Sequence, residues 1–456
     1  MTQAGITDTR GLALTAPDSA AVERFDATVN DIYYYRPGAP DRLDELVEEF
    51  PDFVLAQVFK GYSIVSEGTF DTPPQAIPYL RRAEALPANL RERLHQEALR
   101  AWIAGDFSAR DTTWEQILTR WPLDLLAIHQ YSGTLFWSGD KRRQAEMTAG
   151  IASHWNSGIA GYGHFNSAHA FAMEETGQYA VAERYAREAL VLEPQDLWAL
   201  HALAHVLEMQ GRVEEGVELL EDAARFLDDY NLFRGHLWWH LSLFKLVQGR
   251  FDEALELFDR EIFPQVSSFY LDIQNGASLL ARLEFQGIDV GPERWERLAQ
   301  ASLESSTQNT VWFTAMHQVM ALARSGRISA VQSTLDYLRS AGAASGQAAL
   351  AHDLSRAASA FYRDRPRQAL EQMLAIRSRR GELGASHAQQ DLYEQILITA
   401  ALQIDDWPRV RQLLKARRVT RVWDEASWRD FESRTRHIDA IHDAAAVRAE
   451  LRWDTN

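Results

Sequence analysis

Apolar residues recur every three to four positions along most of the chain, and the alternating runs typical of strands are almost absent. This periodicity predicts amphipathic helices. The helices come in pairs, and a short turn with a glycine joins the two members in WIAGDFS, FWSGDKR, EETGQYA, EMQGRVE, LVQGRFD and ARSGRIS. Self-similarity with a period of about 34 residues is typical of tetratricopeptide-type repeats.

Aligning the turn glycines defines five repeats, which begin at Arg91, Leu125, Gly163, Leu197 and Gly235. The eighth position of each repeat, where its two helices approach closely, is small: Ala98, Ser132, Ala170, Ala204 and Ser242. We therefore predict an all-α, tetratricopeptide-like α-solenoid whose helix pairs form a right-handed superhelix. It would be a single domain over 1–456, with degenerate pairs in 1–90, well-formed repeats in 91–270, and degenerate repeats with a cap in 271–456.

Charge and composition narrow the range of partners and locations that we expect. The 456 residues carry a formal net charge of −17, which argues against nucleic acid and anionic membranes as partners. The chain contains no cysteine, so disulfides and thiolate sites are excluded and a cytoplasmic location is favoured. No apolar run approaches the roughly 18 residues of a spanning helix, and no secretory signal is visible. The sequence leaves open whether the protein forms a homo-oligomer.

One stripe of each first helix carries the candidate chemistry. Repeat positions 2, 5, 9 and 12 line the concave surface in solenoids of this kind, and six of the 14 histidines lie at three of these positions. The walls of the resulting pocket would be His129, His164, Phe171, Trp198 and Trp239. The stripe carries none of the Lys, Arg or Asn residues that grip peptide carboxylates, so it favours a small-molecule substrate.

The segment HALAHVLE places His201, His205 and Glu208 on one helical face, and GHLWWHLSLF repeats the spacing with His236 and His240. Four such imidazoles could hold a divalent metal, zinc or iron, with Glu174 or Glu208 as a further ligand or general base. Without a metal, the same groups would serve in acid–base catalysis. The alternative is that they are satisfied core histidines.

A C-terminal segment, GASHAQQDLYEQ, combines a turn with a helix start. Ser386 is expected to be the N-cap, with Gln389 completing a capping box. His387 and Asp391 are then candidate catalytic residues, which would project from this helix end over the groove. The simpler interpretation is a well-capped helix.

Four segments together resemble the tetratricopeptide repeat protein 38-like family, also called StaR-like: LHALAHVLEMQGRVEEG, HLWWHLSLFKLVQGRFDEA, MHQVMALARSGR and GASHAQQDLYEQILITAAL. The resemblance runs from VERFDATVNDIYYYRP to the region before Ala400. Ala385 and Gln390 depart from the family's GGSxAQRD. The resemblance implies an all-helical fold and a small-molecule context, and it fixes no reaction.

We therefore predict an enzyme that acts on a small organic molecule in the concave pocket, by hydrolytic or acid–base chemistry and with or without a metal. No GxGxxG segment follows a strand, so a dinucleotide cofactor is not expected. The alternative is a scaffold that binds a protein or peptide partner in the groove without catalysis.

Overall fold

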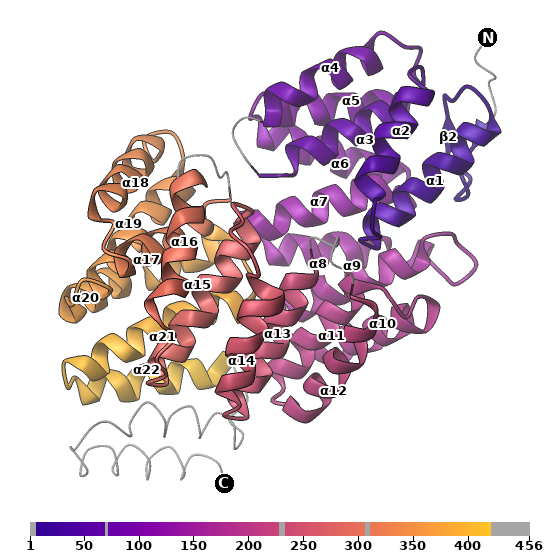
Figure 1. The fold of residues 1–456 in the computed structure, drawn as a ribbon. Coiled ribbons are helices and arrows are strands. Elements are labelled where there is room, and N and C mark those ends of the chain that lie inside the picture. The colour runs from indigo at the N-terminus through magenta and orange to yellow at the C-terminus, as the bar shows by residue number, and fades with distance from the viewer. Residues whose placement is uncertain (1–5, 69–71, 228–232, 306–310, 421–456) are drawn as a thin grey trace. The chain divides into compact units, whose positions relative to one another are not determined.

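The computed structural model describes residues 6–68, 72–227, 233–305 and 311–420 (Figure 1). These residues are almost entirely helical, apart from a small antiparallel ribbon of β1 (Ile6–Thr7) and β2 (Ala13–Leu14). The contacts divide the chain into two compact units. The first contains the described residues within Met1–Leu203 and Phe226–Phe233, and the second contains those within Ala204–Arg225 and Arg234–Asn456.

The first unit is a succession of helix pairs in which neighbours along the chain pack together, as α3 does with α4, α5 with α6 and α9 with α10. Its helices are α1 (Ser19–Tyr33), α2 (Ala39–Glu49), α3 (Val54–Val65), α4 (Thr72–Glu84), α5 (Leu90–Ile103), α6 (Phe107–Arg120), α7 (Leu125–Ser138), α8 (Lys141–Ile151), η1 (Ala152–His154), α9 (Tyr162–Glu174) and α10 (Tyr179–Leu192). Helix α11 (Leu197–Met209) begins in this unit and continues into the second.

The second unit continues the pairs with α12 (Val213–Ala223), η2 (Ala224–Phe226), α13 (Arg234–Val247), α14 (Phe251–Leu257), the π-helical turn η3 (Phe258–Ile262), α15 (Tyr270–Phe285), α16 (Pro292–Ser305), α17 (Thr314–Arg324), α18 (Ile328–Ala341), α19 (Gly346–Phe361), α20 (Pro366–Ile376), η4 (Arg377–Leu383), α21 (His387–Gln403) and α22 (Trp407–Thr420). Alternate helices pack in series, from α13 to α15, α17 and α19. Helix α21 contacts α15 as well as α19, so this part of the array closes on itself.

The turn glycines explain the repeat. Six of them adopt the left-handed backbone conformation, with φ between 69° and 81°: Gly105, Gly139, Gly177, Gly211, Gly249 and Gly326. Glycine adopts this conformation without the steric cost that a Cβ would add. Helices α5, α7, α9, α11 and α13 begin within one residue of the five repeat starts identified in the sequence. The all-α, tetratricopeptide-like fold is therefore confirmed.

The small eighth positions are buried where the paired helices meet, and four of the five, including Ala98 and Ala204, have an exposed fraction of 0%. Aromatic side chains fill the core of the first unit, where Phe53 packs on Phe25 at 5.1 Å between ring centroids and Trp102 meets Trp114 edge to face at 5.5 Å. Across the part of the chain that the structure describes, no helix combines the length and the apolar character needed to span a membrane.

Candidate functional site

Two neighbouring first helices gather the central histidines. In the second unit, His205 of α11 and His236 and His240 of α13 each offer a ring nitrogen, and these atoms lie within 4.8 Å of one another. His201 precedes His205 by one turn of the same helix and offers a fourth nitrogen to this group. All four side chains are buried, with exposed fractions of 0 to 3%. We call this group the histidine cluster.

Local sequence sets the direction of these imidazoles. In both helices the two histidines are four residues apart, so they lie on the same helical face. Helix α11 is started by the buried Asp196, whose Oδ1 accepts hydrogen bonds from the backbone N–H groups of Trp198 (2.9 Å) and Ala199 (3.0 Å). This N-cap fixes where the helix begins.

The rings of the cluster meet edge to face. His205 and His240 lie 4.5 Å apart between centroids with an interplanar angle of 61°, and His236 and His240 lie 4.8 Å apart at 79°. His236 also stacks on Trp239 at 5.1 Å and 14°. With this packing, one ring nitrogen of each histidine lies within 4.8 Å of those of the others.

A residue of α15 orients one member of the cluster. His236 Nδ1 lies 2.8 Å from Oδ1 of Asn275, which is itself buried. An amide oxygen only accepts, so Nδ1–H is the donor, and Nε2 then carries the lone pair that a metal ion needs. On the other side, His240 Nδ1 lies 3.4 Å from a carboxylate oxygen of Glu208. Buried partners of this kind typically orient metal-ligating histidines.

Burial keeps these imidazoles neutral. Burial, with a smaller contribution from the neighbouring His205, lowers the pKa of His240 from 6.5 to about 4. Burial likewise holds the pKa of His236 well below its usual range, and the nearby His240 adds to this effect. At neutral pH both rings are therefore uncharged and present lone pairs instead of N–H⁺ groups.

Arg282 of α15 supports the same region. It is buried, its guanidinium carbon lies 5.6 Å from the centroid of the Trp239 ring, and its Nη2 donates to the backbone carbonyl of Ala388 at 2.8 Å. Arg282 thus connects α13 and α21 to α15. Sequence reasoning did not single out Asn275 or Arg282. Helix α15 carries further polar residues such as Gln274 and Ser278, so no distinct sequence signal marks these two.

The candidate wall residues of the first unit have their own environments. His164 is buried, its Nε2 lies 3.1 Å from Asn30 Oδ1, and its ring lies 3.7 Å from that of Tyr34. His129 is exposed on one side, and Tyr33 stacks on it at 3.8 Å. The remaining two, Phe171 and Trp198, pack on each other at 4.9 Å, with Phe171 also contacting the His201 ring at 5.0 Å. Glu174 is fully buried at the end of α9.

The C-terminal candidates belong to a well-anchored helix. Ser386 and Gln389 form the capping box expected from the sequence. His387 follows as the first residue of α21 and is half-buried. Asp391 is engaged in a buried ion pair, because it accepts from Arg417 Nε at 2.7 Å and Nη2 at 3.0 Å. This pair holds α22 on α21.

Comparison with known proteins finds solved structures of low sequence identity. No family model matches the chain. Among solved structures, a Rap protein complexed with competence and sporulation factor is 12% identical, with a TM-score of 0.43 over 83% of this chain and 99% of that chain. A human IFIT1 dimer with m7Gppp-AAAA is 12% identical, with a TM-score of 0.39 over 97% and 96%. The APC/C hetero-tetramer Cut9-Hcn1 is 15% identical, with a TM-score of 0.37 over 79% and 72%.

These findings correct the partners expected from the sequence. We expected a small-molecule substrate and excluded nucleic acid, and this expectation is wrong. According to their descriptions, the similar structures contain a competence and sporulation factor, m7Gppp-AAAA or the second protein of the Cut9-Hcn1 hetero-tetramer. The physical reason is that a net charge of −17 describes the whole chain, whereas a partner meets the local charge of one surface.

Proposed function

We propose that this chain is a tetratricopeptide-like scaffold for a protein or peptide partner, in which a transition-metal ion bound by the histidine cluster ties α11 to α13. The observation that supports it is the approach of the cluster's ring nitrogens to within 4.8 Å of one another in a buried site. The resemblance to the tetratricopeptide repeat protein 38-like family and a cytoplasmic location are parts of this proposal.

The donor set fits the ion. Imidazole nitrogens suit zinc, iron, nickel and copper, and zinc is held at about 2.0–2.1 Å from each nitrogen. Tetrahedral geometry then places ligand nitrogens about 3.3 Å apart. Nitrogens within 4.8 Å of one another would have to approach by at most about 1.5 Å to reach this arrangement. The neutral state of His236 and His240 removes the proton competition that binding would otherwise face.

The geometry favours a structural ion over a catalytic one. Four imidazoles fill a tetrahedral coordination sphere, whereas a catalytic zinc keeps one position open for water or substrate. The exposed fractions of 0 to 3% leave little surface for a substrate to reach the ion. These features support the scaffold interpretation over an enzyme that uses Glu174 or Glu208 as general base and His387 or Asp391 above the site.

The test is metal binding by the purified chain. We expect about one zinc per chain after removal of excess metal by gel filtration, and a higher melting temperature than in the chelator-treated protein. His205→Gln and His240→Gln should each abolish both effects. His317→Gln is the matched control, because His317 is equally buried in the second unit and bonds to the backbone carbonyl of Phe313.

Cobalt(II) gives a second measurement, because tetrahedral nitrogen coordination produces intense visible absorption that the His205→Gln variant should lack. The proposal fails if the native chain binds no zinc or cobalt. It also fails if His317→Gln loses the metal as completely as His205→Gln does, since a general loss of packing would then explain both.

A further inference from the structure

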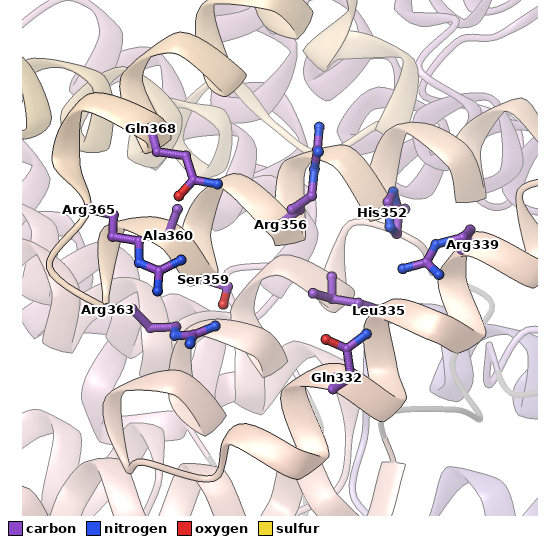
Figure 2. A pocket seen from close by; sticks show the side chains of 10 residues that line it. All are labelled: Gln332, Leu335, Arg339, His352, Arg356, Ser359, Ala360, Arg363, Arg365 and Gln368. Carbon is purple, nitrogen blue, oxygen red and sulfur yellow. The ribbon is translucent and has the colours of Figure 1, made fainter.

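We propose that the groove between α18, α19 and the start of α20 is a docking site for an acidic peptide segment of a partner protein. This inference deepens the scaffold role proposed above and is independent of the metal ion. The groove encloses a cavity of about 310 Å³ in the second unit. Its ten lining residues are Gln332, Leu335, Arg339, His352, Arg356, Ser359, Ala360, Arg363, Arg365 and Gln368 (Figure 2).

The lining is strongly basic, although the chain as a whole is acidic. Four of the ten residues are arginines, and none is an aspartate or glutamate. Figure 2 shows Arg363 and Arg365 at one end of the groove and Arg339 with His352 at the other, with Leu335 and Ser359 between them. Guanidinium groups bind carboxylates through paired hydrogen bonds, so this lining selects for anions.

Nearby carboxylates neutralise only part of the positive charge of the lining. Asp336 lies 3.1 Å from Arg339, and Asp353 contacts both His352 (3.2 Å) and Arg356 (3.8 Å). Within the described residues, no ion pair involves Arg363 or Arg365, and the carboxylate between them in sequence, Asp364, is exposed. The end of the groove formed by these two arginines therefore has the largest uncompensated positive charge.

The N-terminus of α20 adds to this end. Arg365 is its N-cap and makes no side-chain capping hydrogen bond, and Gln368 of the first turn also lines the groove. An uncapped helix N-terminus carries partial positive charge and backbone N–H donors. A carboxylate placed beside Arg363 and Arg365 would thus meet two guanidinium groups and the start of a helix.

The shape fits an extended segment. His352, Arg356, Ser359 and Ala360 form one stripe of α19, about 12 Å long at 1.5 Å per residue. An extended peptide covers that length with about four residues. Leu335 and Ala360 are the apolar residues of the lining. Within this stripe Arg356 is exposed, whereas Ser359 and Ala360 are buried.

An acidic peptide fits better than RNA. Single-stranded RNA is commonly held by stacking its bases on aromatic side chains, and the ten lining residues include no Phe, Tyr or Trp. The carboxylates of Asp336 and Asp353, which contact lining residues, would also repel a continuous phosphate backbone. A short peptide can place its own carboxylates beside the arginines and avoid these positions.

The test is fluorescence anisotropy with a labelled eight-residue peptide that alternates Glu and Leu, using the full chain at low salt. A peptide of the same length that alternates Lys and Leu, and so has the opposite charge, and an eight-nucleotide uridine RNA serve as comparison probes. We expect the acidic peptide to bind, the basic peptide not to bind, and the RNA to bind at least tenfold more weakly than the acidic peptide. The double variant Arg363→Gln/Arg365→Gln should weaken peptide binding at least tenfold.

A matched control separates the groove from general charge. Arg142→Gln/Arg367→Gln makes the same change in net charge at two exposed arginines outside the lining, and it should change affinity less than twofold. Equal losses in both double variants, absence of peptide binding, or tighter binding of the RNA would each overturn the proposal. Zinc binding, measured on the same preparations, should remain intact in both variants. A failure here is thereby distinguished from a failure of the metal site.

Discussion

Gly216 of α12 allows the close approach of the helix that carries half of the histidine cluster. A Cβ added at this position would lie 2.5 Å and 2.6 Å from Cε2 and Cε1 of Phe244, a buried residue of α13. Favourable carbon–carbon contacts are about 3.5–4.0 Å, so the Phe244 ring must retreat by roughly 1 Å. In the packed interior, Gly216→Ala therefore forces α12 and α13 apart.

The expected cost can be set against the gain from helix propensity. Overpacking of this kind costs about 1–3 kcal/mol, while Ala in place of Gly favours an exposed helix interior by about 1 kcal/mol. Because a whole ring must move, we expect Gly216→Ala to lose roughly 1–2 kcal/mol of unfolding free energy. Gly133→Ala is the control: in α7 a Cβ would meet nothing within 4 Å, so the same change should gain up to about 1 kcal/mol.

Urea denaturation followed by circular dichroism measures both variants against the native chain. Phe244→Leu should cost less in the Gly216→Ala background than in the native one, because the smaller side chain relieves the contact, and a double-mutant cycle gives this coupling directly. A Gly216→Ala protein as stable as the native chain, or additive effects of the two substitutions, would refute the close contact between α12 and α13.

Two further predictions concern buried charge. Burial is the main cause that lowers the pKa of His317 from 6.5 to about 3, with Arg282 adding to it, against a hydrogen bond to the Phe313 carbonyl. The pKa of His317 is lower in the folded than in the unfolded chain, so protonation at low pH favours the unfolded state. The contribution of the neutral His317 to the free energy of unfolding is therefore complete above pH 6.5 and is lost as pH falls toward 3. Between pH 7.5 and 5.5 the native chain should lose about 1.4 kcal/mol of unfolding free energy through His317. Urea titrations at the two pH values should show that His317→Gln lacks this loss, and an equal pH dependence in both proteins would contradict the prediction. Asp391→Asn should leave the buried Arg417 without its carboxylate and cost about 3–5 kcal/mol, which Asp391→Asn/Arg417→Met should largely restore; a loss below 1 kcal/mol in the single variant would argue against the pair.

Local sequence determined the helix pairs of this protein. The spacing of apolar residues, the glycines at the turns and the small eighth positions predicted helices α5, α7, α9, α11 and α13 to within one residue of their starts. It also determined that His201 with His205, and His236 with His240, share one face of their helix. These features depend on helical periodicity and on backbone conformations that glycine adopts readily, and both act over a few residues.

Tertiary structure decided what surrounds those faces. Asn275 of α15 orients His236 from 39 positions away in the sequence. Arg417 forms an ion pair with Asp391 across 26 positions. The four central histidines were expected to line a concave pocket, and packing of neighbouring helices buries them to 0–3% exposure. The groove between α18, α19 and the start of α20 likewise takes its lining from three helices. In the sequence, each of these helices carries no more than ordinary exposed charge. Periodicity defines the side of a helix on which a residue lies, whereas only the packing of whole helices determines which side chains meet there.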